Sequence, residues 1–187
     1  MQIRTSDIEL KYLADNNKEE LKPVLTSFIS EYGGHFAGGA TGNSTGELLD
    51  YFEEHRVEHG ISIGGLYVNN NTLIGLGGFH YLEDTGLYEV VCAVLPQFED
   101  NHAIALNHLI LQAFGSLMMD KLCARAVPAS VTDVCLANSG FVFSGERVFM
   151  KEDDGRIWNY YELEDESNLV SAESTTAYSD NEWDALF

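Results

Sequence analysis

The hydrophobic and polar positions of residues 85–121 change from the period of a strand to that of a helix. Residues 85–94 are rich in β-branched and aromatic side chains, and Pro96 then removes a backbone donor, so a buried strand is predicted to end there. Apolar residues at i, i+3, i+4 spacing follow, and they predict a helix with one buried face that includes Leu117 and Met118 and runs to Lys121. The short loop between them would leave free backbone N–H groups at the helix start, where anions bind.

The same patterns predict the remaining elements. Asn69, Asn70 and Asn71 tolerate positive φ and predict a hairpin turn, and Ser44 and Glu47 resemble a capping box that starts a helix. In chain order we predict a strand at 8–13, a helix at 21–32 with Pro23 in its first turn, a glycine-rich surface loop at 33–46, a helix ending near Gly60, strands at 61–68 and 72–80, a strand at 122–127, a short helix at 131–137, and a final hairpin of 141–150 and 156–163.

The chain of 187 residues carries 30 acidic and 10 basic side chains, a formal charge of −20. Such a charge argues against direct binding of nucleic acid or an anionic membrane. It indicates solubility or adaptation to salt or, in a sharper interpretation, a basic partner or mimicry of a polyanion. No Lys or Arg occurs from Val57 to Asp120, so the predicted anion-binding turn lies in a segment without cations.

No apolar run reaches membrane-spanning length and residues 1–10 lack the apolar core of a signal peptide, so a soluble cytoplasmic protein without membrane contact is expected. Cys92, Cys123 and Cys135 lie in apolar surroundings and are predicted to be buried free thiols. His55 and His59 could share a metal, but no acid or cysteine at useful spacing supports this. We therefore predict no metal site and place the pair on a solvated helix face.

The order strand, Pro96, loop and helix resembles the GNAT (Gcn5-related N-acetyltransferase) superfamily, in which the loop holds the pyrophosphate of acetyl-CoA. Two smaller motifs extend the resemblance over about residues 8–163. Ser139-Gly140-Phe141 is similar to the family's Leu-Gly-Phe, and Asp154-Gly155 before Tyr160 and Tyr161 resembles the ending of ribosomal-protein-type acetyltransferases. The resemblance implies an α+β domain of residues 1–163, a mixed, mostly antiparallel sheet with helices on both faces.

The cofactor loop departs from the family pattern. The family's Gln/Arg-x-x-Gly-x-Gly/Ala falls on Glu99, His102 and Ile104, and two adjacent carboxylates outweigh the roughly half positive charge of a helix N-terminus. The family's Asn-x-x-Ser similarly falls on Ala129 and Thr132. We therefore expect no cofactor. If acetyl-CoA does bind, the resemblance assigns its contacts to Val94, Phe98, Asp100, Asn101, His102 and Ala103.

Acetyl transfer needs a base for the amine and an acid for the leaving thiolate. Glu89 is the candidate base, through a water, although a surface or hairpin-paired carboxylate is an equally good interpretation. Tyr160 or Tyr161 is the candidate acid, although aromatic residues on a final strand usually belong to the core. His80 and His102 could also titrate near neutral pH.

Residues 164–187 form an acidic tail with seven acids and no Lys or Arg, and we expect it to be disordered on its own. Trp183, Leu186 and Phe187 nevertheless have the i, i+3, i+4 spacing of a helix that enters an apolar groove. The groove could belong to a protein partner with a basic or grooved surface, which we favour, or to the chain's own domain.

Three functional hypotheses follow. The favoured one is a degenerate GNAT domain that acts as a binding or structural module, for example in a phage virion or an anti-defence assembly, and so in a host cytoplasm or virion. The alternative is an active N-acetyltransferase for a basic protein N-terminus or a polyamine. The third is mimicry of nucleic acid by the acidic surface.

Overall fold

The computed structural model describes residues 3–12, 18–32, 45–69, 71–148 and 157–165. A seven-stranded sheet has the order β1-β2-β3-β4-β5-β7-β6, and among these strands only the β4–β5 pair is parallel. The strands are β1 (Ile8–Lys11), β2 (Ile63–Val68), β3 (Thr72–Leu82), β4 (Leu87–Val94), β5 (Lys121–Ala126), β6 (Val142–Val148) and β7 (Ile157–Glu164). The helices are α1 (Lys18–Tyr32), α2 (Thr45–His59), α3 (His102–Leu111) and α4 (Val131–Asn138), with a short 3₁₀ helix at Thr5–Asp7.

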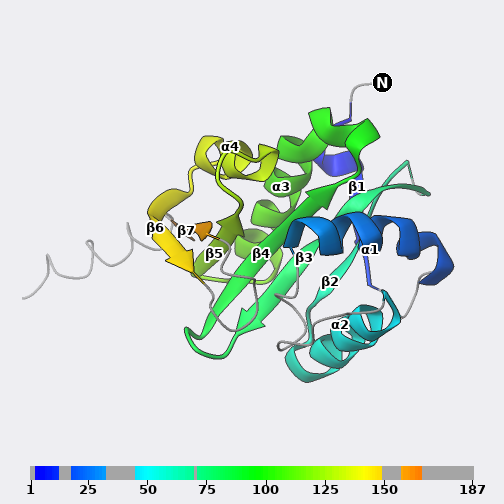
Figure 1. Ribbon diagram of the computed structural model, residues 1–187, viewed down its shortest axis with the longest axis horizontal. Coiled ribbons are helices and arrows are strands. Elements are labelled where there is room, and N and C mark those ends of the chain that lie inside the picture. Colours follow the sequence, from blue (N-terminus) through cyan, green and yellow to red (C-terminus); the bar gives the residue numbers. More distant parts are fainter. Residues whose placement is uncertain (1–2, 13–17, 33–44, 70, 149–156, 166–187) are drawn as a thin grey trace, which may run out of the picture.

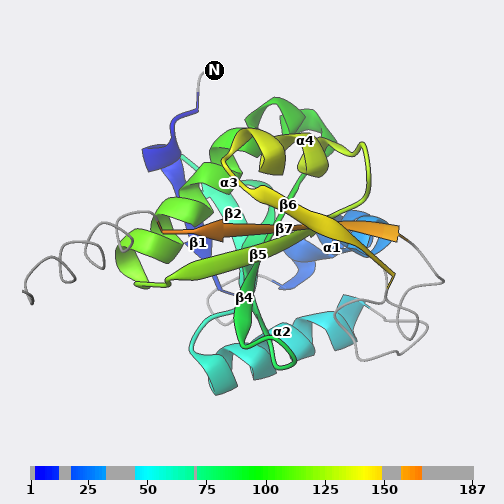
Figure 2. The same cartoon turned by 90° about the vertical axis from the view of Figure 1, so that its left-hand side faces the viewer.

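Helices cover both faces of the sheet, as the sequence predicts (Figures 1 and 2). One core cluster joins α3 and α4 to the sheet through residues such as Leu106, Leu109 and Leu136. A second joins α1 and α2 to the other face through residues such as Phe28, Phe52 and Trp158. Because strand side chains alternate between faces, β2, β3, β4 and β7 contribute to both clusters, and the predicted α+β class is confirmed.

The antiparallel meander β2–β3–β4 forms where the hydrophobic pattern predicts it. Asn69 has a φ of 51°, the left-handed conformation expected in the β2–β3 turn. A Cβ on Gly77 would lie 2.9 Å from Leu109 Cδ1, so this glycine lets α3 pack closely on the sheet. The glycines of β3 therefore serve packing, as expected.

Several strand ends differ from the predictions by about two residues, and three helical features differ more. The expected loop after β4 is a 3₁₀ helix, Pro96–Asn101, that continues into α3. The following helix ends in a π-helical turn, Gln112–Ser116, instead of running to Lys121, and Met118 beyond it is 77% exposed. Helix α1 begins at Lys18, so Pro23 lies inside the helix and not in its first turn, on an exposed position.

Strands β4 and β5 pair over only two positions, Tyr88 with Leu122 and Glu89 with Cys123. Both strands continue beyond these pairs, up to Val94 and Ala126, so they separate toward their carboxyl ends. The start of α3 follows β4 at this end. The fold thus makes an opening in the sheet directly after Glu89.

Among the described residues, no helix is long and apolar enough to cross a membrane. The predicted capping residue Ser44, the glycine-rich segment, the turn 152–155 and the tail with Trp183, Leu186 and Phe187 lie outside the described residues.

Candidate functional site

A row of polar side chains crosses the sheet on the face covered by α1 and α2. His80 on β3 is paired with Glu89 on β4, Glu89 with Cys123 on β5, and Arg125 with Tyr160 on β7. These residues alternate with core residues that face α3, such as Phe79, Val90 and Ala124. The row therefore follows from strand periodicity and register, and it lies where β4 and β5 separate.

Glu89 and Arg125 form a buried bidentate ion pair. Arg125 Nε donates to Glu89 Oε1 at 2.7 Å, and a terminal guanidinium nitrogen donates to Oε2 at 2.8 Å. The side chains are 2% and 4% exposed, so each charge depends on the other for compensation. The interpretation of Glu89 as a surface carboxylate is wrong, and its role as a base stays a prediction.

His80 connects this ion pair to helix α2. Its Nε2 lies 2.6 Å from the Tyr51 hydroxyl oxygen, and its Nδ1 lies 3.8 Å from Glu89 Oε2. A proton on Nδ1 is favoured by the nearby carboxylate, which leaves Nε2 to accept from the Tyr51 hydroxyl. Tyr51, His80 and Glu89 thus lie in a row, with a hydrogen bond between the first two and a separation longer than a hydrogen bond between His80 and Glu89. The outer member of the row is a half-buried phenol.

His55 is a structural histidine, which corrects its predicted place on a solvated face. Its Nε2 accepts the Tyr81 backbone N–H at 2.9 Å, so its Nδ1 carries the proton and donates to the Ile61 carbonyl at 2.9 Å. Burial, together with the nearby His80, lowers the pKa of His55 to about 4. His55 is therefore neutral near pH 7 and holds α2 against the β2 and β3 segments.

The two candidate tyrosines lie on opposite faces of β7. Tyr160 shares a face with Trp158 and the polar row, and it hydrogen-bonds with the Cys123 thiol. Tyr161 packs in the cluster under α3 and α4 and donates to Asp133 Oδ1 at 2.7 Å. Burial and this hydrogen bond raise the pKa of Tyr161 to about 12. Only Tyr160 therefore lies with Glu89.

The predicted cofactor residues gather at the start of α3. The Phe98 N–H is bonded to the Leu95 carbonyl at 2.8 Å and the His102 N–H to the Glu99 carbonyl, so these donors are already used. Asn101 Nδ2 donates back to the Phe98 carbonyl at 3.3 Å. The exposed side chains at this turn include Glu99, Asp100 and Ala103.

His102 is buried beneath this turn, and burial lowers its pKa to about 4. The expectation that His102 titrates near neutral pH is therefore wrong, because burial disfavours its charged form. Its Nε2 has no hydrogen-bond partner among the described residues. His102 therefore does not supply the positive charge that the turn lacks.

The opening between β4 and β5 and the turn before α3 are bordered by different groups. The side chains that follow the separation point, Cys92, Ala93, Ala124 and Ala126, are small. The turn before α3 carries the two carboxylates that the sequence predicts, but its N–H groups at Phe98 and His102 are bonded where the sequence predicts free donors. Val94 is half-buried against the α3 cluster and borders the same opening.

Neither a metal site nor a nucleophilic cysteine emerges. Among the described residues, no group of three or more His, Cys, Asp or Glu side chains could hold a metal ion. Cys92 and Cys123 are buried free thiols, as predicted, and Cys135 is half-buried. Burial and the nearby Glu89 raise the pKa of Cys123 to about 12, so it carries no thiolate near neutral pH.

Sequence reasoning missed Tyr51 and Arg125. Arg125 is the single charged residue in the apolar stretch Leu122–Val127, and a lone charge in a buried strand signals a buried partner. Tyr51 gives no such signal, because only the packing of α2 brings its hydroxyl to His80.

Comparisons with known proteins support the fold. No family model and no curated protein matches the chain. The spermidine N-acetyltransferase SpeG from Vibrio cholerae, solved in complex with CoA and spermine, is similar with a TM-score of 0.64 and 16% identity, over 88% of this chain and 99% of that one.

Two further structures agree. Mutant forms of the same spermidine/spermine N-acetyltransferase give a TM-score of 0.66 at 15% identity, over 89% of this chain and 99% of theirs. A probable acetyltransferase gives a TM-score of 0.62 at 18% identity, covering 86% and 93%. These likenesses confirm that the chain has the fold of GNAT acetyltransferases.

Proposed function

We propose that this protein is an acetyl-CoA-dependent N-acetyltransferase whose acceptor is a cationic amine. The observation that carries the proposal is the row Tyr51–His80–Glu89–Arg125, which ends at the point where β4 and β5 separate. Titratable side chains in close contact beside an opening in the sheet make a candidate catalytic site.

The proton of the amine leaves through Tyr51. The Tyr51 hydroxyl contacts the acceptor nitrogen and passes its proton to His80 Nε2 as it receives one, because the two atoms are only 2.6 Å apart. The imidazolium that forms on His80 is stabilised by Glu89, 3.8 Å from Nδ1. Arg125 orients the Glu89 carboxylate, so Glu89 acts through His80 and not on the amine directly.

Acetyl-CoA would supply an activated thioester, so that a C–N bond to the amine forms as the C–S bond breaks and CoA thiol leaves. The strand ends bordered by Ala93 and Ala124 would hold its arm, and the start of α3 near Phe98 would face its phosphates. Tyr160, which lies on the same face as Glu89, is our candidate for protonating the leaving thiolate.

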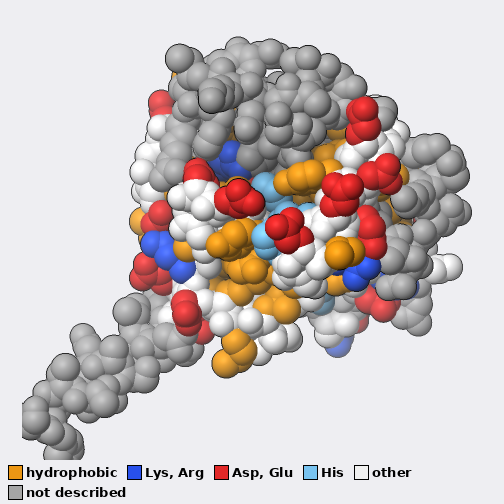
Figure 3. Space-filling view, turned by 90° about the horizontal axis from the view of Figure 1, so that it is seen from below, with side chains coloured by type: hydrophobic (Ala, Val, Ile, Leu, Met, Phe, Trp, Pro, Cys, Tyr) orange, Lys and Arg blue, Asp and Glu red, His pale blue; other side chains and the backbone are white. Residues whose placement is uncertain are grey.

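A cationic acceptor matches the surface around the site. Figure 3 shows histidine side chains between hydrophobic and acidic side chains on the lower face of the molecule. Exposed acids at the end of α2, in the turn between β3 and β4 and before β5 include Glu58, Glu83, Asp84 and Asp120, and an acidic surface attracts polyamines. The similar fold of spermidine N-acetyltransferases points to the same class, with a basic protein N-terminus as the second acceptor to test.

The experiment is a turnover assay with acetyl-CoA and spermidine, read by mass spectrometry of the acetylated amine. The wild-type chain should give product, and Tyr51→Phe and Glu89→Gln should each lose most of it. His108→Asn, which changes a histidine on α3 bonded to the Thr5 carbonyl, is the matched control. Absence of product from both spermidine and a basic peptide N-terminus would contradict the proposal.

A second candidate is a binding module that has lost the cofactor. The observation in its favour is the 3₁₀ helix Pro96–Asn101, whose bonded N–H groups and exposed Glu99 and Asp100 replace a glycine cradle. It predicts a folded protein with no heat of binding for acetyl-CoA in calorimetry, and micromolar binding would contradict it. Assembly in a virion, an anti-defence role and nucleic-acid mimicry remain predictions from the sequence.

A further inference from the structure

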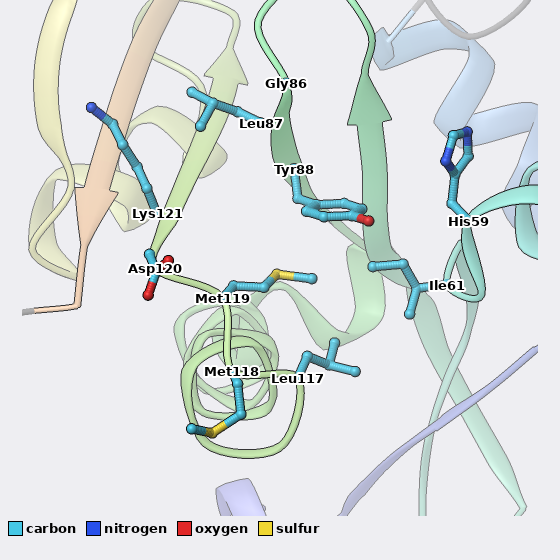
Figure 4. A pocket seen from close by; sticks show the side chains of 10 residues that line it. All are labelled: His59, Ile61, Gly86, Leu87, Tyr88, Leu117, Met118, Met119, Asp120 and Lys121. Atoms are coloured by element: carbon cyan, nitrogen blue, oxygen red, sulfur yellow. The ribbon is translucent and has the colours of Figure 1, made fainter. Parts of the chain in front are cut away.

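A cavity with a volume of about 480 Å³ lies at the start of β4 and β5, the end of these strands that is opposite to the start of α3. Figure 4 shows its walls converging from the end of α2, the start of β4 and the segment between α3 and β5. Apolar side chains dominate, and Asp120 and Lys121 lie at one side. The lining residues are His59, Ile61, Gly86, Leu87, Tyr88, Leu117, Met118, Met119, Asp120 and Lys121.

Two methionines of the segment between α3 and β5 line this cavity: in Figure 4 Met119 extends toward Ile61, and Met118 points outward from the rim. The π-helical turn Gln112–Ser116 ends the helix, and Met118 then adopts a φ of 54°, a conformation that costs a non-glycine residue free energy. Met118 is also 77% exposed. An exposed, strained methionine at the rim of an apolar cavity contributes nothing to the core, and such adaptable side chains are typical of surfaces that bind a partner segment.

The chain itself leaves the described domain at the rim of this cavity. The Asp165 backbone N–H donates to the Asp120 carbonyl at 3.0 Å, directly after β7 ends. Lys121 Nζ binds Glu162 and Glu164 at 2.9 and 3.1 Å and fixes the end of β7 beside the same wall. The remaining 22 residues, 166–187, therefore start next to the cavity.

We propose that the end of the tail docks into this cavity of its own domain, with Trp183, Leu186 and Phe187 as the buried residues. Trp183 lies 18 residues beyond Asp165. A flexible chain of that length has an end-to-end distance on the order of 25 Å, enough to return to a cavity beside its origin. The cavity falls within the range of about 300–1,000 Å³ that buries a drug-sized ligand, a size comparable to a small cluster of large side chains.

Covalent attachment favours this occupant over another chain. A tethered segment has an effective concentration in the millimolar range, so weak apolar contacts suffice to keep it bound. The tail and the domain are both acidic, since residues 166–187 add five carboxylates and no cation. Docking is therefore driven by apolar burial against charge repulsion, and added salt should increase the docked fraction by screening.

The test uses Trp183 fluorescence in the full-length chain, after subtraction of the Trp183→Phe spectrum to remove buried Trp158. Docked Trp183 should emit at shorter wavelength and be quenched several-fold less by acrylamide than in a peptide of residues 164–187. Met118→Glu should release it, as should Leu186→Asp in the tail. Val134→Glu, at an exposed valine on α4 outside the cavity, should change nothing.

A peptide-like Trp183 spectrum in the wild-type chain would overturn the proposal. So would a blue shift that requires micromolar protein and coincides with dimers in sedimentation, because the tail would then bind a second copy. A blue shift unaffected by Met118→Glu would place the tail elsewhere. None of these readouts depends on acetyl-CoA, so the result stands apart from the proposed activity.

Discussion

The two ends of the opening between β4 and β5 carry different chemical groups. On the α2 side, Tyr51, His80, Glu89 and Arg125 form a connected set of side chains with partners within 2.6–3.8 Å. At the start of α3, the corresponding place for phosphates has bonded backbone N–H groups and exposed carboxylates at Glu99 and Asp100. One end resembles a working site and the other departs from the family pattern.

Under the proposed activity, the difference teaches that the two halves of a transferase site are encoded separately. The proposed proton transfer depends on side chains that strand register aligns, His80, Glu89 and Arg125 on three strands, together with Tyr51 on α2. Cofactor binding in this fold depends on backbone N–H groups, which a 3₁₀ turn can occupy without disturbing the sheet. A comparison of the two ends therefore separates catalysis from cofactor affinity.

The largest expected effect is on the turnover rate, from a substitution in the row of side chains next to α2. His80→Asn removes the proton acceptor for Tyr51, and the turnover rate should fall about 10²–10⁴-fold with little change in stability. The assay is steady-state acetylation of spermidine by the wild-type chain and by the variant. An unchanged rate in His80→Asn would remove the relay from the mechanism.

The next effect concerns the ion pair. Arg125→Ala leaves the Glu89 carboxylate buried without its cation, which should reduce the free energy of unfolding by about 3–5 kcal/mol in urea titrations. Lys121→Ala is the control, because its pairs with Glu162 and Glu164 are partly exposed and should contribute less than about 1 kcal/mol. Replacing both partners, Glu89→Leu with Arg125→Met, should recover most of the loss; no recovery would show that the charges do more than compensate each other.

A third prediction concerns the negative charges at the start of α3. Glu99→Gln with Asp100→Asn removes two negative charges, each contributing about 1 kcal/mol of repulsion toward a phosphate in water. Acetyl-CoA should bind about tenfold more tightly or more, measured by calorimetry at low salt. Glu146→Gln, on β6, removes one acid outside this turn and serves as the control. Equal affinities would show that bonded N–H groups, and not charge, limit binding.

The smallest effect is a pH dependence beneath the same turn. Burial lowers the pKa of His102 to about 4 in the folded protein, below its unfolded value of about 6.5. The unfolded chain therefore takes up a proton first as the pH falls, and stability should be complete above about pH 6.5 and decline toward about pH 4. His102→Leu should reduce the slope of the free energy of unfolding against pH by at most about 1.4 kcal/mol per pH unit, the value for one proton. The decline should become shallower and not vanish, because His55 contributes in the same direction.

Much of the fold could be predicted because its signals are local. Alternating apolar residues predicted the β2–β4 meander, which the structure contains. The asparagines predicted its turn, and Asn69 has the expected positive φ. The end of α3 was predicted too late, because Leu117 and Met118 fit the helical spacing although the chain unwinds into a π-helical turn before them. The spacing of apolar residues does not show where the backbone leaves the α-helical conformation.

The candidate site was only partly predictable. Glu89 was found from its place on the strand before the loop, but its partner Arg125 lies 36 positions away and comes close only through sheet order. The separation of Tyr160 from Tyr161 follows from alternation once the faces are known, and the sequence alone does not say which face carries the site. Tyr51 depends on how α2 packs, which is a tertiary property.

The two-position pairing of β4 with β5 divides the sheet into two antiparallel blocks, β1–β4 and β5–β7 with β6. Glu89 belongs to one block and Arg125 to the other, so their hydrogen bonds cross the boundary. A motion that widened the opening would have to stretch this contact, so we expect the ion pair to oppose rotation of the blocks, and amide exchange at Tyr88 and Cys123 would report such a rotation.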